Sequence, residues 1–154
     1  MGDVYFYHLT RRSVADALGP LLDRSLRQGW RVAVRGTDAD RLDLLDEALW
    51  LGPKDGFLPH GRAGGPHDAR QPILLTTEAA APNAPHCVVA VDGAALEADE
   101  VRGLERAAVV FEAADDMAMR WARGRWKTLT EAGVGARYWS EESGRWQEKM
   151  TRNV

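Results

Sequence analysis

The sequence predicts an α/β fold in which a mostly parallel central sheet is flanked by helices. Three observations support this prediction. In the first fifty residues, β-rich apolar stretches alternate with segments of helical periodicity, and this order favours parallel strands joined by right-handed crossovers. Three further short apolar runs follow later in the chain. The 154 residues, 45% hydrophobic and 28% charged, also suffice for one globular domain with a sizeable core.

The first strand and helix have clear signals. Asp3–Leu9 is aromatic and β-branched, which is typical of a strand. Ser13 or Thr10 can cap the helix that follows, and apolar residues keep helical spacing to about Gln28. Because proline lacks an N–H group and clashes inside a helix, we expect a break or kink near Gly19–Pro20.

The second strand, Trp30–Arg35, leads into a helix that Asp38 caps and that extends through Trp50. The alternation then stops. Residues 51–71 contain five glycines and three prolines but few apolar side chains. A connection of this length exceeds what a compact domain requires, so we expect it to carry function.

The remaining elements are predicted from apolar runs and turn signals. They are strands at 72–76, 87–91 and 107–111, a weak helix at 97–106, a helix at 115–133 and an edge strand at 135–139. We therefore expect one α/β domain over residues 1–140, followed by a polar C-terminal tail over 141–154.

The helix predicted over Asp115–Gly133 is amphipathic. At roughly 100° per residue, apolar residues and basic residues fall on separate sides of this helix. The apolar side comprises Ala118, Ala122, Trp126 and Leu129, and the basic stripe comprises Arg120, Arg123 and Lys127. Two interpretations are open. The helix either packs on the core with a solvated basic face, or its Arg123–Trp126–Lys127 cluster holds an acidic peptide with an apolar end.

A second candidate surface surrounds Trp50 and Phe57, two large aromatic residues in an otherwise polar segment. They either close the loop onto the core or form an exposed anchor for a partner.

The sequence gives little support for a catalytic site or a bound cofactor. The turn after the first strand, HLTRRSV, has no glycine to let backbone N–H groups approach a phosphate. The four histidines and Cys87 lack the spacing of a zinc site, and no G-x-S-x-G nucleophile motif is present. We interpret His60 as a loop residue hydrogen-bonded to backbone, and Cys87 as an inert buried thiol. No cofactor and no metal are expected.

Charge and cysteine content indicate which ligands the protein can bind and in which compartment it is expected. A net charge of −3 is unsuited to non-specific nucleic-acid binding, so an anion site must be a local patch. One cysteine permits no intrachain disulfide and favours a reducing compartment. The N-terminus does not read as a signal peptide, and no segment has transmembrane length. A cytoplasmic protein with no membrane contact is expected.

A series of short motifs follows in order along the chain: FYHLT, GWRVAVR, LDEALW, FLPHG, QPILLT, VFEAADDMAMRWARGRWKTLTEAG, YW and GRW. In these motifs and their order, the chain resembles the chi subunit of bacterial DNA polymerase III over nearly its full length. The resemblance implies a fold close to a mononucleotide-binding α/β domain, without a bound nucleotide and without catalytic activity. Chi proteins link the clamp-loader complex, usually through a psi subunit, to the single-stranded-DNA-binding protein. Contact with nucleic acid is then only indirect.

The resemblance also implies site residues. The family's A-R-x-R-[YW]-K motif reads Ala122 to Lys127 here. Arg123 and Lys127 would meet acidic groups of the binding protein's C-terminal tail, and Trp126 would shape a slot for its terminal phenylalanine. The surface facing psi would include Trp50, Phe57, Pro59 and His60.

Two other functions compete with this adaptor. One is a small nucleotide- or nucleic-acid-binding α/β protein with a degenerate phosphate loop. The other is a helicase-associated repair adaptor, in which the Trp50–Phe57 surface accepts more than one partner.

Overall fold

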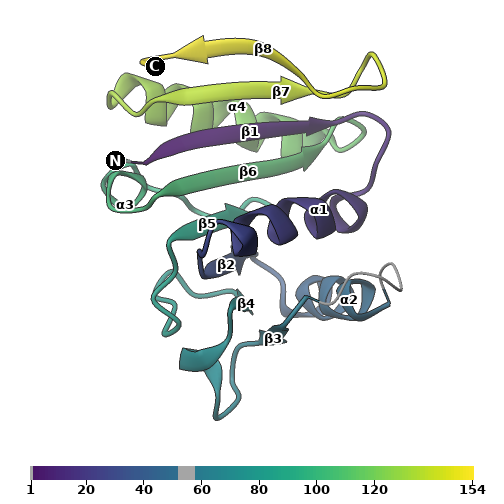
Figure 1. Ribbon diagram of the computed structural model, residues 1–154. Helices are drawn as coiled ribbons and strands as arrows, with labels where there is room; N and C mark the ends of the chain where they lie inside the picture. Colours follow the sequence, from purple (N-terminus) through teal and green to yellow (C-terminus); the bar gives the residue numbers. More distant parts are fainter. Residues whose placement is uncertain (1, 52–57) are drawn as a thin grey trace.

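A computed structural model describes residues 2–51 and 58–154. They form an eight-stranded sheet in the order β3-β4-β2-β5-β6-β1-β7-β8 (Figure 1). All pairs are parallel except β7–β8, which confirms the predicted α/β fold with a mostly parallel sheet. The strands are β1 (Asp3–Leu9), β2 (Val32–Arg35), β3 (His60–Arg62), β4 (Ile73–Thr76), β5 (Cys87–Ala90), β6 (Arg106–Glu112), β7 (Ala136–Ser140) and β8 (Gln147–Arg152).

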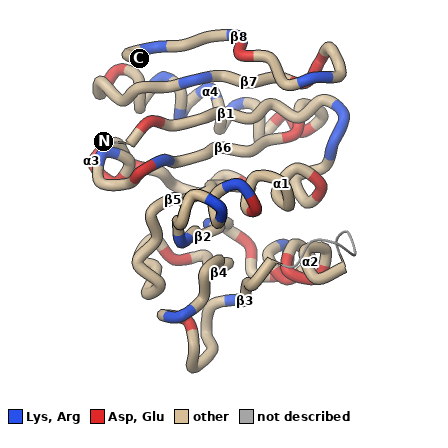
Figure 2. The backbone as a smooth tube through the Cα atoms, in the orientation of Figure 1, with Lys and Arg blue, Asp and Glu red and all other residues tan. Residues whose placement is uncertain are grey.

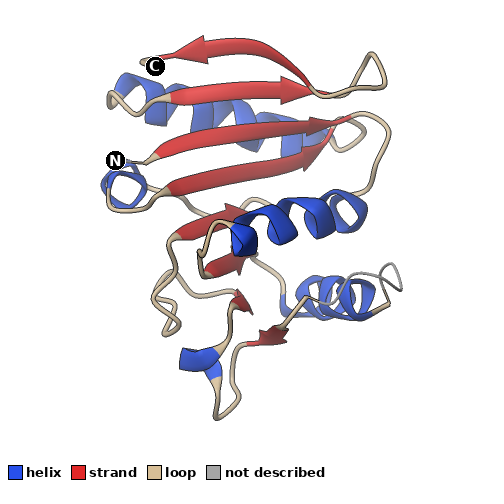
Figure 3. Cartoon of the chain, in the orientation of Figure 1, coloured by secondary structure: helices blue, strands red, loops and turns tan. Residues whose placement is uncertain are grey.

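Helices cover both faces of the sheet (Figures 1 and 3). The helices α1 (Val14–Arg27) and α2 (Ala39–Trp50) pack on one face, and α3 (Ala98–Arg102) and α4 (Asp116–Glu131) on the other. Side chains alternate along each strand. In β1, Val4 and Phe6 therefore join the core under α4, whereas Leu9 joins the core under α1 and α2.

The first helix is continuous across Gly19 and Pro20, so the expected break is absent from α1. Ser13 is its N-cap and accepts a hydrogen bond from the backbone N–H of Asp16 at 3.1 Å. An internal proline costs about 3 kcal/mol. Leu18 and Leu22 are fully buried on either side of Pro20, and this burial offsets the cost.

The C-terminal region differs from the prediction. Strand β7 is not at the edge of the sheet, because it lies between β1 and β8. Part of the expected polar tail is β8, which pairs antiparallel with β7 and has a register shift between Tyr138 and Trp139. Every residue of β8 is exposed, so the segment is polar as expected but gives no alternating apolar signal.

Within the long segment before β4, the structure describes β3 and a 3-10 turn at Asp68–Arg70. Asp68 accepts hydrogen bonds from the backbone N–H groups of Gly64 and Gly65, which orders this turn.

Candidate peptide-binding pocket

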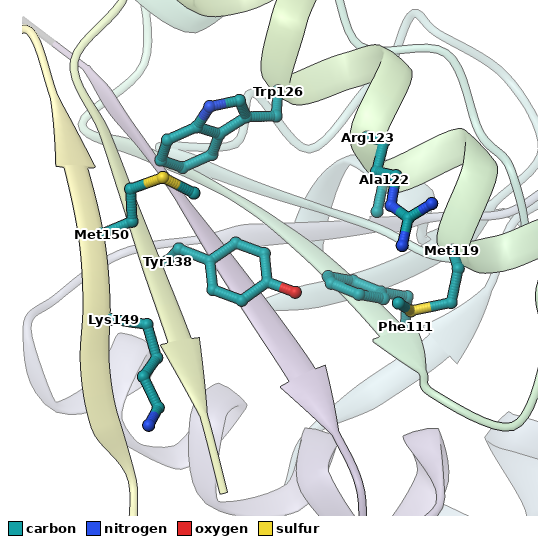
Figure 4. Close-up of a pocket in the computed structure, with 8 residues that line it drawn as sticks. All are labelled: Phe111, Met119, Ala122, Arg123, Trp126, Tyr138, Lys149 and Met150. Carbon is teal, nitrogen blue, oxygen red and sulfur yellow. The ribbon is translucent and has the colours of Figure 1, made fainter. Parts of the chain in front are cut away.

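A pocket of about 420 Å³ opens on the face of the sheet that α4 covers (Figure 4). It lies between α4, the end of β6, and the β7–β8 pair. Its lining residues are Phe111, Met119, Ala122, Arg123, Trp126, Tyr138, Lys149 and Met150.

Local sequence explains why α4 stands where it does. Asp115 caps it by accepting a hydrogen bond from the backbone N–H of Ala118 at 3.1 Å. Gly133, with φ of 87°, follows the C-cap, where a left-handed residue ends a helix without strain. Ala122 and Leu129 are buried against the sheet, which confirms the predicted apolar side.

Trp126 forms one wall of the pocket. Its indole packs edge to face on Phe6, with ring centroids 5.2 Å apart, and on Tyr138, with centroids 5.9 Å apart. Contacts of this kind hold a ring in one orientation and add stability beyond its buried area. The pocket therefore has a preformed aromatic wall.

A further aromatic group forms the floor. Phe111 is 2% exposed, and the ring of His8 stacks on it with centroids 5.3 Å apart. Burial lowers the pKa of His8 from its ordinary value, while the nearby Glu142 and Glu141 oppose the change. Burial raises the pKa of Tyr138, while the positive charge of Arg123 acts in the other direction. His8 and Tyr138 are therefore both uncharged at neutral pH, so the floor of the pocket carries no charge.

The pocket has a cation on each of two elements. Arg123 lies on α4 and Lys149 on β8 (Figure 4). Among the described residues, neither side chain has a carboxylate within 4.0 Å. An apolar floor with two unpaired cations at its rim suits a short anionic ligand that carries an apolar group.

The structure separates the residues predicted for this site. Arg123 and Trp126 line the pocket, but Lys127 is exposed and is not part of the lining. The sequence reasoning missed Lys149 and Met150, because they reach the pocket only through the pairing of β8 with β7. The position of Tyr138 in the pocket could have been predicted from strand alternation. In an alternating strand Tyr138 shares a face with the buried Ala136.

The second candidate surface lies at the end of α2. Trp50 is 53% exposed, and its ring lies on that of His60 with centroids 4.2 Å apart. His60 is buried, and its ring nitrogens lie 2.5 Å from the carbonyl oxygen of Leu58 and 3.2 Å from that of Asp46. This confirms the expected bonding of His60 to backbone, but His60 is the first residue of β3 and not a loop residue. Pro59 is half-buried, and Phe57 lies outside the described residues.

His60 is buried beneath the ring of Trp50, so the indole is the more exposed member of this pair. Leu44 and Leu51 are also exposed nearby in sequence, and α2 carries several acidic residues (Figure 2). The surface is thus apolar with acidic surroundings, opposite in charge to the pocket under α4.

The turn after β1, where a phosphate would bind in a nucleotide-binding domain, already holds an anion. One oxygen of Glu141 accepts backbone N–H groups of Thr10, Arg11 and Arg12, each at 3.1 Å. Its other oxygen lies 3.2 Å from Nε of Arg12. At the start of α1, Glu112 accepts the N–H of Val14 at 3.1 Å. Carboxylates of the chain therefore occupy the places that a phosphate would take.

The described residues contain no group of three histidine, cysteine or acidic side chains arranged to hold a metal ion. None of the helices described is long and apolar enough to span a bilayer. Cys87 is buried, and burial raises its pKa to about 12.

The fold and the pocket define an α/β protein of nucleotide-binding-like topology that presents a basic-rimmed aromatic pocket beside its C-terminal helix. Comparison with known proteins identifies the family within this class of proteins. Residues 1–137 match the family model for the DNA polymerase III chi subunit, HolC, so the chain belongs to that family.

A similar curated protein is the probable DNA polymerase III subunit chi of Rickettsia prowazekii (strain Madrid E). It is 29% identical over 77 residues, which cover 50% of this chain and 47% of the relative. The chain thus matches about half the length of that relative. Family membership supports an accessory role in DNA replication.

Proposed function

We propose that this chain is a non-catalytic subunit that links the clamp-loader complex of DNA polymerase III to single-stranded-DNA-binding protein. In this proposal the pocket under α4 holds the acidic C-terminal tail of the binding protein. The observation that carries the proposal is an aromatic floor beside two cations, Arg123 and Lys149, neither of which has a carboxylate within 4.0 Å among the described residues.

Each part of the pocket has a role in this model. A terminal aromatic side chain enters between Trp126 and Phe111, where it loses contact with water. The terminal carboxylate lies at Arg123, whose guanidinium can donate two parallel hydrogen bonds. Lys149, on β8, adds a second positive charge to the pocket lining. Lys127, one turn beyond Arg123, attracts acidic groups farther along the tail by longer-range charge.

The surface around Trp50 is proposed for a second partner, a psi-like subunit or a helicase. It lies on α2, on the opposite face of the sheet from the pocket, so both partners can bind at once (Figure 1). Trp50→Ala should remove capture of that partner while leaving tail binding unchanged. Loss of both activities would indicate misfolding instead.

The competing nucleotide-binding function is disfavoured by Glu141. A phosphate would have to displace a carboxylate that already accepts three backbone N–H groups. A thermal-shift screen with nucleotides is expected to show no saturable stabilisation. A clear saturable shift would favour the nucleotide-binding function.

The direct test of the proposed pocket is fluorescence anisotropy with a labelled acidic peptide that ends in phenylalanine. Arg123→Ala should weaken binding about tenfold or more, since a charge-assisted hydrogen bond is lost. Arg120→Ala is the matched control, because Arg120 is exposed on the same helix but does not line the pocket. Equal affinities for wild type and Arg123→Ala would show that the tail binds elsewhere.

A further inference from the structure

The sheet has a second exposed face, opposite the pocket. In the part of the chain that the structure describes, α1 packs over β2 and β6, and no helix covers β7 and β8 on that side (Figures 1 and 3). Tyr5 and Tyr7 of β1 point to this side, because Val4 and Phe6 point to the α4 core.

Aromatic rings and guanidinium groups follow one another across this face. The guanidinium of Arg106 lies over two rings, 4.2 Å from the centroid of Tyr5 and 5.1 Å from that of Trp30. Tyr5 lies 6.3 Å from Tyr7 between centroids, and Tyr7 lies 5.5 Å from Trp146. We name this set of five residues the open face.

Two cations of this region have no anionic partner among the described residues. Within the described part of the chain, Arg106 and Arg24 form no side-chain hydrogen bond or ion pair, whereas Arg12 pairs with Glu141 and Arg137 with Glu148. Arg24 and Arg106 line one hollow of about 170 Å³ together with Trp30 and Gln28. Figure 2 shows basic residues on α1 and at the start of β6, the elements that form this hollow.

We propose that the open face binds single-stranded nucleic acid, with a phosphate between Arg24 and Arg106 and bases packed against the aromatic side chains beside them. The guanidinium of Arg106, which lies over the rings of Tyr5 and Trp30, can donate its N–H groups to phosphate oxygens. Flat aromatic surfaces interleaved with cations are the features that bind single strands without sequence preference.

The open face suits a nucleic acid better than an acidic peptide. The pocket under α4, of about 420 Å³, is lined mostly by apolar and aromatic side chains, whereas the hollow beside Trp30, of about 170 Å³, is lined partly by polar groups such as Ser25 and Gln28. Burial raises the pKa of Tyr7 to about 12, so this phenol adds no negative charge to the surface at neutral pH. The open face and the pocket lie on opposite faces of the sheet, so this inference does not depend on the proposed tail binding.

The test uses the full chain and a fluorescently labelled twelve-residue oligothymidylate at low salt. We expect saturable binding, with a slope of log affinity against log salt of about −0.7, the value for one phosphate on a single strand. Arg24→Ala and Trp30→Ala should each weaken binding about tenfold. Arg24 is exposed on α1, so its replacement leaves the fold intact. Arg123→Ala, on the opposite face, is the control and should bind as wild type does.

Four results would overturn the inference. One is the absence of saturable binding at low salt. Another is equal binding by wild type, Arg24→Ala and Trp30→Ala. The third is displacement of the oligonucleotide by an acidic peptide without aromatic residues, which would assign the open face to a peptide. Binding of a duplex as tightly as the single strand would also contradict base packing against the aromatic side chains.

Discussion

The indole of Trp126 meets the phenol ring of Tyr138 edge to face, with centroids 5.9 Å apart and ring planes at 81°. This contact joins α4 to β7 across the pocket. Because both rings are held by neighbours before any ligand arrives, little side-chain entropy remains to be lost on binding. The pocket is therefore preorganised for an aromatic group.

Lys149 should matter more than Lys127 for peptide affinity. Lys149 lines the pocket, whereas Lys127 lies outside it. We expect Lys149→Ala to weaken binding of the acidic peptide by about 1 kcal/mol or more and Lys127→Ala by less, since exposed charges interact weakly. Isothermal titration calorimetry at two salt concentrations measures both. The reverse ranking would mean that the tail lies along α4 rather than between α4 and β8.

Glu141 should be a major contributor to stability. Its carboxylate is 3% exposed and accepts three backbone N–H groups from the β1–α1 turn. We expect Glu141→Ala to lower the free energy of unfolding by about 2–4 kcal/mol, because three backbone N–H groups and the guanidinium of Arg12 lose a buried charged acceptor. Urea denaturation checks this.

Glu142 supplies the matched control, since its side chain is exposed next to Glu141. Glu142→Ala should change stability by no more than about 0.5 kcal/mol. A similar small change for both variants would show that the carboxylate of Glu141 does not fasten the β7–β8 connection to the β1–α1 turn.

His8 should make stability fall in mild acid. Burial lowers its pKa in the folded protein below the ordinary 6.5. Below that pH the unfolded chain binds more protons than the folded chain, so the free energy of unfolding decreases as pH falls. We expect His8→Phe, which keeps an aromatic ring beside Phe111, to reduce this dependence between pH 7.5 and about 5.5. If the free energy of unfolding falls with pH equally in wild type and in His8→Phe, His8 is not the cause of the pH dependence.

Cys87 should resist alkylation in the native protein. It is 2% exposed, and burial raises its pKa to about 12, so the reactive thiolate is scarce at neutral pH. Iodoacetamide labelling followed by mass spectrometry should show slow modification at pH 7.5 and rapid modification in denaturant. Equal rates would mean that β5 opens readily.

The central fold could be predicted because its signals are local. The apolar strands and the capped helices follow from runs such as CVVA and from Asp38, Ser13 and Asp115, which act on their own neighbours. The helix carrying Arg123 and Trp126 was predictable for the same reason.

The rest depends on contacts between distant segments. Strand β8 has no buried residue, and only its pairing with β7 brings Lys149 to the pocket. Nothing in a local pattern indicates that Glu141 reaches the turn at Thr10, which is 131 residues away. The continuity of α1 through Pro20 likewise reflects tertiary burial, which local propensity does not include.

The central claim is that an acidic peptide ending in an aromatic residue enters the pocket beside Trp126. The chain has six tryptophans, and each gives one indole N–H signal in a ¹H–¹⁵N correlation spectrum. Titration with the peptide should shift the Trp126 signal strongly and leave Trp121 nearly unchanged, since Trp121 donates its N–H to the carbonyl oxygen of Ala94 outside the pocket. A titration in which Trp126 stays fixed while Trp30, Trp50 or Trp146 moves would contradict the account.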